Sequence, residues 1–158
     1  MKRRGVVAAV LLLTASIPLA MAQSDLKRPS SSDQYVPRLG DIMSAAQAQH
    51  QKLWLAAAAQ NWELAAYELG QLESSLAEAA MMYSGIPVSN VTTLKDPLQS
   101  VSDAIAAKDG RKFAKAYGNL TEGCNSCHTS MGRSFIAIRV PTGPQPFANQ
   151  QFPPQRKP

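Results

Sequence analysis

The chain is poor in the residues from which most catalytic centres and metal sites are built. It has two cysteines and two histidines among 158 residues. So few thiols and imidazoles leave no serine or cysteine nucleophile with a matching base. We therefore expect no enzymatic activity, and no metal site beyond the one that a single histidine can help to form. Runs of β-branched residues are also scarce, and no internal repeat of solenoid type is present, so the composition favours helix over sheet.

Both cysteines and one of the two histidines lie in a single stretch of five residues, 124–128, which reads Cys-Asn-Ser-Cys-His. The pattern C-x-x-C-H is the attachment signature of a c-type haem. Two thiols three positions apart lie one helical turn apart, so both reach the vinyl groups on one porphyrin edge and form thioether bonds. The adjacent His128 then lies under the iron, where an imidazole nitrogen is the usual proximal ligand. We therefore predict one covalent haem c, bound by Cys124, Cys127 and His128.

Other uses of a C-x-x-C pair compete with this interpretation. A thioredoxin-like redox pair is expected in a βαβ setting, and no strand-like alternation surrounds the motif. A four-ligand zinc site needs two more Cys or His residues, and only His50 is left after His128. A short disulfide between Cys124 and Cys127 contributes little loop-closure entropy. The histidine directly after the second cysteine favours haem.

The N-terminal sequence predicts export. Residues 1–22 have the form of a secretory signal peptide, with three basic residues at 2–4, an apolar run over 6–20 and a small-x-small cleavage site ending at Ala22. An uncleaved membrane anchor is the alternative, but the run is short for a span of about 20 residues. The residue directly after the cleavage site is Gln23 and not a cysteine, which argues against a lipoprotein. Thioether formation requires exported haem, so we expect the mature protein in the periplasm, with no membrane span.

The net charge changes when the signal peptide is removed. The full chain carries 16 Lys and Arg against 11 Asp and Glu, a net charge of +5. The signal peptide holds three of the cations, which leaves 13 against 11 and a net charge of +2. No basic stripe remains for nucleic acid. Lys108, Arg111, Lys112 and Lys115 form a local basic group, either a solvated helix start or a docking patch for an acidic redox partner.

The mature chain divides into three segments. Residues 23–36 are polar and predict a mobile leader, residues 37–135 are rich in helix formers, and residues 136–158 carry six of the eleven prolines and predict an irregular tail. The middle segment predicts four helices, at about 37–59, 62–83, 96–108 and 111–134. Asn61 is the expected N-cap of the second helix, and Asp96 that of the third, with Pro97 in its first turn.

Apolar spacing identifies the inner faces of the first two helices. On the first helix we expect the core seam to be Leu39, Met43, Ala46, His50, Leu53 and Ala57, and on the second helix Leu64, Ala65, Leu69, Leu72, Leu76 and Met81. Four helices with short connections predict an all-α fold, an antiparallel up-down-up-down four-helix bundle with the haem near the end of its last helix.

Residues 37–135 resemble the cytochrome c-prime family of four-helix-bundle cytochromes. The resemblance is carried by the C-x-x-C-H motif on the last helix and by Arg-Leu-Gly-Asp-Ile-Met at 38–43 on the first. It implies that a first-helix residue faces the iron, either as an apolar blocker or as a Met ligand. Two bundles often pair as a homodimer in this family, and the sequence leaves open whether this chain does so. The chain departs from the family in its Pro-rich tail and in lacking basic residues directly after His128.

The second axial position has three candidate states. If the first and last helices are antiparallel neighbours, His128 lies ~26 Å and Met43 ~24 Å from their shared end, at 1.5 Å per residue. His50 lies only ~14 Å from that end. The levels favour Met43 as the iron ligand. His50 as ligand, or an open iron with Met43 only blocking it, remain alternatives.

These expectations lead to function hypotheses of different classes. With His128 and Met43 as metal ligands, the protein is a periplasmic electron carrier that exchanges electrons with a redox partner protein. With an open iron, it binds a small gas such as nitric oxide or carbon monoxide. A third hypothesis, a haem subunit of a larger oxidoreductase, differs in requiring a stable partner.

Overall fold

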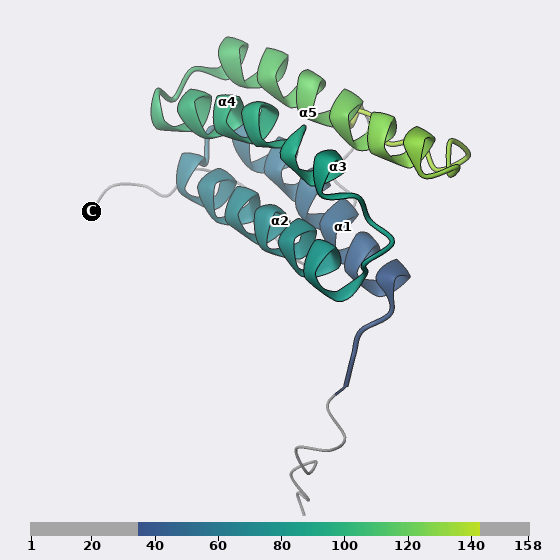
Figure 1. Cartoon of the computed structure of the whole chain (residues 1–158). Coiled ribbons are helices and arrows are strands. Elements are labelled where there is room, and N and C mark those ends of the chain that lie inside the picture. The colour runs from purple at the N-terminus through teal and green to yellow at the C-terminus, as the bar shows by residue number, and fades with distance from the viewer. Residues whose placement is uncertain (1–34, 143–158) are drawn as a thin grey trace, which may run out of the picture. The chain divides into compact units, whose positions relative to one another are not determined.

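The computed structural model describes residues 35–142, and this part of the chain is all-helical, as the sequence predicts (Figure 1). The helices are α1 (Leu39–Ala58), α2 (Trp62–Met82), α3 (Val88–Thr92), α4 (Lys95–Ala106) and α5 (Gly110–Ser130). No strand occurs within the described range. The predicted signal peptide at 1–22, the predicted leader up to residue 34 and residues 143–158 of the predicted tail lie outside the described residues.

Helix α1 begins at Leu39, directly after the predicted start. Its N-cap is Arg38, whose guanidinium lies 3.0 Å from the carboxylate of Asp41 in the first turn. The buried face consists of Ile42, Ala46, His50, Leu53, Ala56 and Ala57. Four of the six predicted seam residues are in this set. Leu39 and Met43 are only half-buried, because both line a cavity.

Asn61 caps helix α2 as predicted, because its side chain accepts a hydrogen bond of 3.1 Å from the Leu64 backbone N–H. The prediction that Met81 points inward is wrong, since this side chain is 80% exposed. Met81 follows buried Ala79 by two positions, which places it on the far side of the helix. Beyond the helix, the Tyr83 hydroxyl donates to the Pro37 carbonyl at 2.8 Å, so the end of α2 lies beside the start of α1.

The region before the last helix differs most from the sequence prediction. A short helix, α3, was not expected, and α4 begins at Lys95 with Leu94 as its N-cap, so Asp96 is not the cap. Thr93 and Leu94 keep helical backbone angles, which makes α3 and α4 almost continuous. Pro97 still lies in the first turn, where its missing N–H costs no hydrogen bond.

Helix α5 starts after Asp109, whose side chain accepts from the backbone N–H groups of Arg111 and Lys112, both at 3.0 Å. The helix ends at Ser130, four residues earlier than predicted. The reason is Gly132, which turns the chain with a φ of +69°, a left-handed conformation that glycine adopts without strain. The residues after this turn fold back beside α5 rather than continuing the helix.

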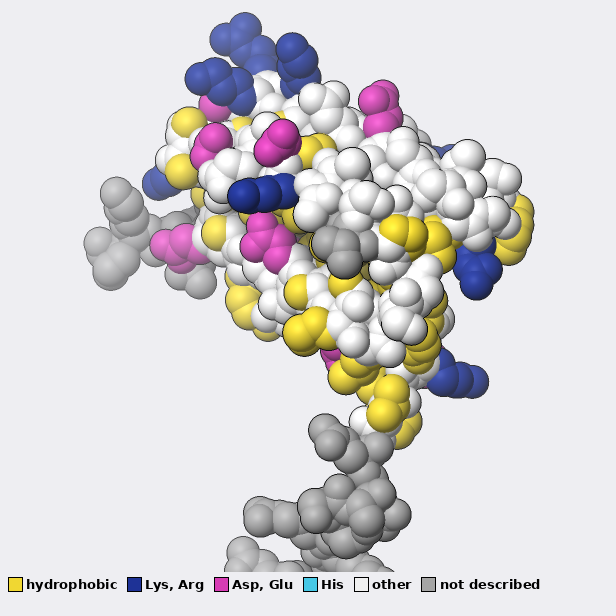
Figure 2. Space-filling model, viewed as in Figure 1, with side chains coloured by type: hydrophobic (Ala, Val, Ile, Leu, Met, Phe, Trp, Pro, Cys, Tyr) yellow, Lys and Arg dark blue, Asp and Glu magenta, His cyan; other side chains and the backbone are white. Residues whose placement is uncertain are grey.

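The four long helices pack as two pairs, α1 with α2 and α4 with α5, and Figure 1 shows the second pair lying beside the first. Trp54, Phe113 and Tyr117 form an aromatic group in the core between them, with ring centroids 5.0–6.1 Å apart. Figure 2 shows Lys and Arg side chains gathered over the start of α5, where the predicted basic group is exposed. Within the described residues, no helix is both long and apolar enough to cross a membrane.

Candidate functional site

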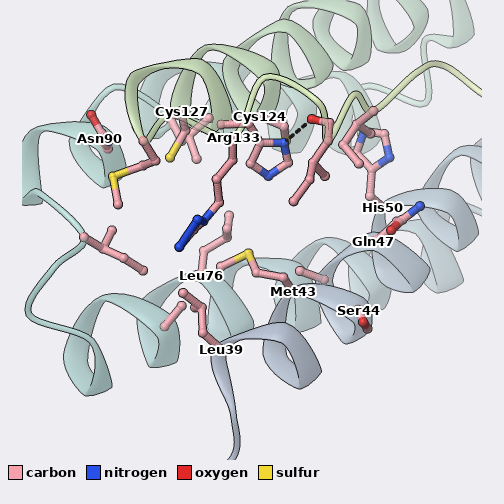
Figure 3. A pocket seen from close by; sticks show the side chains of 18 of the residues that line it. Leu39, Met43, Ser44, Gln47, His50, Leu76, Asn90, Cys124, Cys127 and Arg133 are labelled. Carbon is pink, nitrogen blue, oxygen red and sulfur yellow. Dashed lines mark hydrogen bonds between the residues drawn. The ribbon is translucent and has the colours of Figure 1, made fainter.

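The residues selected from the sequence line one cavity of about 600 Å³. Cys124, Cys127 and His128 line it from α5, and Met43 and His50 line it from α1 (Figure 3). Residues of α2, α3 and the segment after α5 complete the walls. The volume falls in the range of pockets that enclose small organic molecules and cofactors.

The two cysteines are free thiols, half-buried on the same side of α5. Burial raises the pKa of the Cys124 thiol to about 11, and it raises the pKa of the Cys127 thiol as well. Both lie near the C-terminus of their helix, whose dipole also disfavours a thiolate. Redox-active C-x-x-C pairs have a lowered thiol pKa at a helix N-terminus. The environment of these thiols is therefore unlike that of a dithiol oxidoreductase.

Among the residues that the structure describes, His128 has one ring nitrogen engaged in a hydrogen bond and one without a partner. Its Nδ1 lies 2.8 Å from the carbonyl oxygen of Ile136, the bond drawn as a dashed line in Figure 3. A carbonyl only accepts, so Nδ1 carries the proton and donates. In the neutral imidazole, Nε2 then keeps its lone pair. This is the arrangement of metal-ligating histidines, which donate the other ring N–H to a backbone carbonyl or carboxylate.

His50, the alternative ligand, has both ring nitrogens engaged within the core. Nδ1 lies 2.8 Å from the Tyr117 hydroxyl, and Nε2 lies 3.0 Å from the Thr121 hydroxyl. The imidazole is only 3% exposed, and burial lowers its pKa to about 4, so it is neutral at pH 7. His50 therefore connects α1 to α5 through hydrogen bonds, and neither nitrogen has a lone pair directed into the cavity.

Met43 and Arg133 occupy the space between the walls. Figure 3 shows the Met43 thioether directed from α1 into the cavity, and the Arg133 side chain reaching into it from beyond α5. Most of the remaining lining residues are apolar, among them Leu39, Leu72 and Leu76. Neither of the two ion pairs in the described part of the chain involves Arg133. The cavity is thus a mainly apolar space whose lining includes one cation, the exposed Arg133.

The segment after α5 forms part of this site, although the sequence placed most of it in an irregular tail. Phe135, Ile136 and Ile138 line the cavity, and Ile138 is joined to Asn125 of the motif by two hydrogen bonds of 2.7 and 2.8 Å. The weak apolar alternation over 135–138 is the sequence signal for this contact. Nothing in the sequence identifies Asn125 or Arg133 as site residues, because their roles depend on the turn at Gly132.

In the described part of the chain, no three His, Cys, Asp or Glu side chains gather as ligands for a metal ion. A haem iron needs none, since the porphyrin supplies four of its ligands and the protein one or two.

Comparisons with known proteins identify no relative: no family model, no curated protein and no solved structure matches the chain.

Proposed function

We propose that the chain is a periplasmic mono-haem c-type cytochrome that carries electrons, with Cys124 and Cys127 holding the porphyrin and His128 and Met43 as axial ligands. The observation that carries the proposal is that all four residues, chosen from sequence alone, line the same cavity. A haem in that cavity would supply one-electron chemistry at its iron. The chain's own residues hold the haem, orient it and exclude water.

The hydrogen bonding of His128 supports its role as proximal ligand. Because the Ile136 carbonyl holds the proton on Nδ1, the Nε2 lone pair of the neutral ring is available to iron. An accepting carbonyl also increases the electron donation of the imidazole. His128 follows Cys127 directly, so a porphyrin attached to the two sulfurs has its iron beside this ring.

Helix register supports Met43 as the second ligand. His50 on α1 contacts Thr121 on α5, which sets the level at which the two helices meet. His128 lies seven residues after Thr121, and Met43 lies seven residues before His50, about 10 Å along each helix. If α1 and α5 run antiparallel, as in the bundle we propose, Met43 and His128 reach the same level. His50 remains about 10 Å below them and keeps its own partners.

The chemistry of the cavity fits an apolar molecule that carries a negative charge. Its walls are mainly aliphatic side chains, whereas the exposed Arg133, which also lines it, has no carboxylate partner within the described residues. A haem has a large apolar macrocycle and two propionates at one edge. We assign Arg133 to a propionate, which would partly compensate its charge.

Covalent attachment is tested by expressing the full chain with its own signal peptide in a host that matures c-type cytochromes. We expect a red periplasmic protein whose haem stays on the polypeptide through denaturing electrophoresis and acid-acetone extraction. Changing both Cys124 and Cys127 to Ser should abolish the covalent stain. Colourless wild-type protein, or haem that extracts, would contradict the proposal.

Electron transfer through a Met-ligated iron is tested by Met43→Ala, with the exposed Met81→Ala as the matched control. The wild type and Met81→Ala should give a low-spin spectrum that carbon monoxide does not alter. Met43→Ala should become high-spin and bind carbon monoxide. If the wild-type iron is already high-spin and binds carbon monoxide, the protein is a gas-binding cytochrome and not an electron carrier.

A further inference from the structure

The chain that leaves α5 returns along the helix and is held against the C-x-x-C-H motif. We call residues 133–140 the strap. The strap begins where the Arg133 N–H donates to the His128 carbonyl at 2.7 Å, and the Ile136 N–H then donates to the Arg133 carbonyl at 2.9 Å. Its far end is partly buried, because Val140 packs against the hydrophobic core. The strap thus follows α5 back from the end of the helix (Figure 1).

Asn125, the first residue between the two cysteines, fastens the middle of the strap. Its Nδ2 donates to the Ile138 carbonyl at 2.8 Å, and its Oδ1 accepts from the Ile138 N–H at 2.7 Å. The side-chain amide therefore pairs with one residue's backbone in both directions. An amide is needed for this pairing, since a carboxylate supplies no donor.

We call this pairing of Asn125 with Ile138 the clamp. It lies close to the carbonyl that accepts a hydrogen bond from His128. Ile136, whose carbonyl accepts from His128 Nδ1–H, lies between the turn at Arg133 and the clamped residue Ile138. The backbone on both sides of Ile136 is thus hydrogen-bonded to the motif helix. Loops carrying only one such anchor open at low free-energy cost. Two anchors leave the carbonyl little freedom to turn away from the imidazole.

We propose that Asn125 is a positioning residue for the proximal ligand: by clamping Ile138 it holds the Ile136 carbonyl against Nδ1–H of His128. This inference rests on the proposed function. With the clamp in place, the imidazole is held in one tautomer and one orientation, and its electron donation to iron is increased. Stronger donation favours the ferric state, so the clamp lowers the reduction potential of the bound haem.

The test uses haem-bearing full-length protein with Asn125→Ala, and Asn119→Ala as the matched control, an exposed asparagine on the same helix. In Asn125→Ala we expect about a tenfold higher ferrous-to-ferric ratio at a fixed applied potential, which corresponds to about 59 mV for one electron. We also expect faster trypsin cleavage after Arg139 in the strap. Asn125→Asp should show a smaller shift in the same direction, because it keeps only the acceptor.

Two results would overturn the inference. If cleavage is faster but the potential is unchanged, Asn125 supports the strap alone and not the ligand. If neither changes, the clamp has no role. Should Asn125→Ala fail to acquire haem, Ile138→Pro removes the same backbone N–H from outside the motif, and an unchanged potential there overturns the proposal. Colourless wild-type protein would refute the proposed function itself, whereas haem-bearing variants that match the wild type refute only the role of Asn125.

Discussion

The two histidines, His50 on α1 and His128 on α5, lie in contrasting environments. His50 lies in the core, 3% exposed, with both ring nitrogens hydrogen-bonded to α5. His128 lies half-buried at the cavity, with one nitrogen hydrogen-bonded to Ile136 and the other without a partner among the described residues. Residue type is identical, so the number of local partners decides which imidazole stabilises the fold and which one is available to a ligand.

Replacing each histidine by alanine tests this contrast most directly and should give the largest effects. His128→Ala should lose the low-spin spectrum, because the change removes the proximal ligand that we propose. It should lower the stability by only about 1 kcal/mol, through the loss of one hydrogen bond. His50→Ala should keep the spectrum and lose about 3 kcal/mol, because a core cavity forms and two buried hydroxyls lose a partner. Absorption spectra and urea unfolding measure the two effects.

The same spectral change in both histidine variants would contradict this division of roles. If His50→Ala also abolishes the low-spin spectrum while the protein stays folded, His50 is a ligand and the assignment of Met43 is wrong.

The pH dependence of stability should report His50. Its pKa is about 4 in the folded protein, against 6.5 for the free side chain, because burial disfavours the charged ring. The unfolded chain therefore binds the proton first as pH falls. The contribution of neutral His50 to the free energy of unfolding is therefore fully present above about pH 6.5 and decreases as pH falls towards 4. The total change is about 3 kcal/mol.

Urea unfolding at pH 7, 6 and 5 measures this effect above the range where most carboxylates titrate. His50→Gln, which has no titrating ring, should flatten the profile. An equally steep profile in that variant would assign the pH dependence to other groups.

A smaller effect is expected at the glycine beside the motif. A Cβ built on Gly123 would lie 2.6 Å from Cδ2 of Leu94, a buried cavity-lining residue, so Gly123→Ala must displace that side chain. We expect a loss of about 1 kcal/mol and a small change in the haem spectrum. Gly118→Ala on the same helix meets no atom within 4 Å and should stabilise by about 0.5–1 kcal/mol. Equal effects at the two sites would show that α5 does not need its close approach to Leu94.

Much of the helical layout was predictable because its signals are local. Asn61 caps α2 through a residue three positions away, and the cysteines of the motif share a helix face by spacing alone. The errors also have local causes. Gly132 ends α5 early, the helix α3 forms before Pro97, and Met81 lies on the side of α2 opposite buried Ala79.

The sequence alone determined that the described chain is helical and that Cys124, Cys127 and His128 lie together, because both follow from residues within one or two turns of each other. Only the tertiary structure decided that Met43 lines the same cavity, that His50 is occupied by Tyr117 and Thr121, and that Ile136 meets His128. The first two depend on contacts between α1 and α5, about 70 residues apart in the chain. The third depends on the backbone turn at Gly132, whose direction no helical or apolar periodicity encodes.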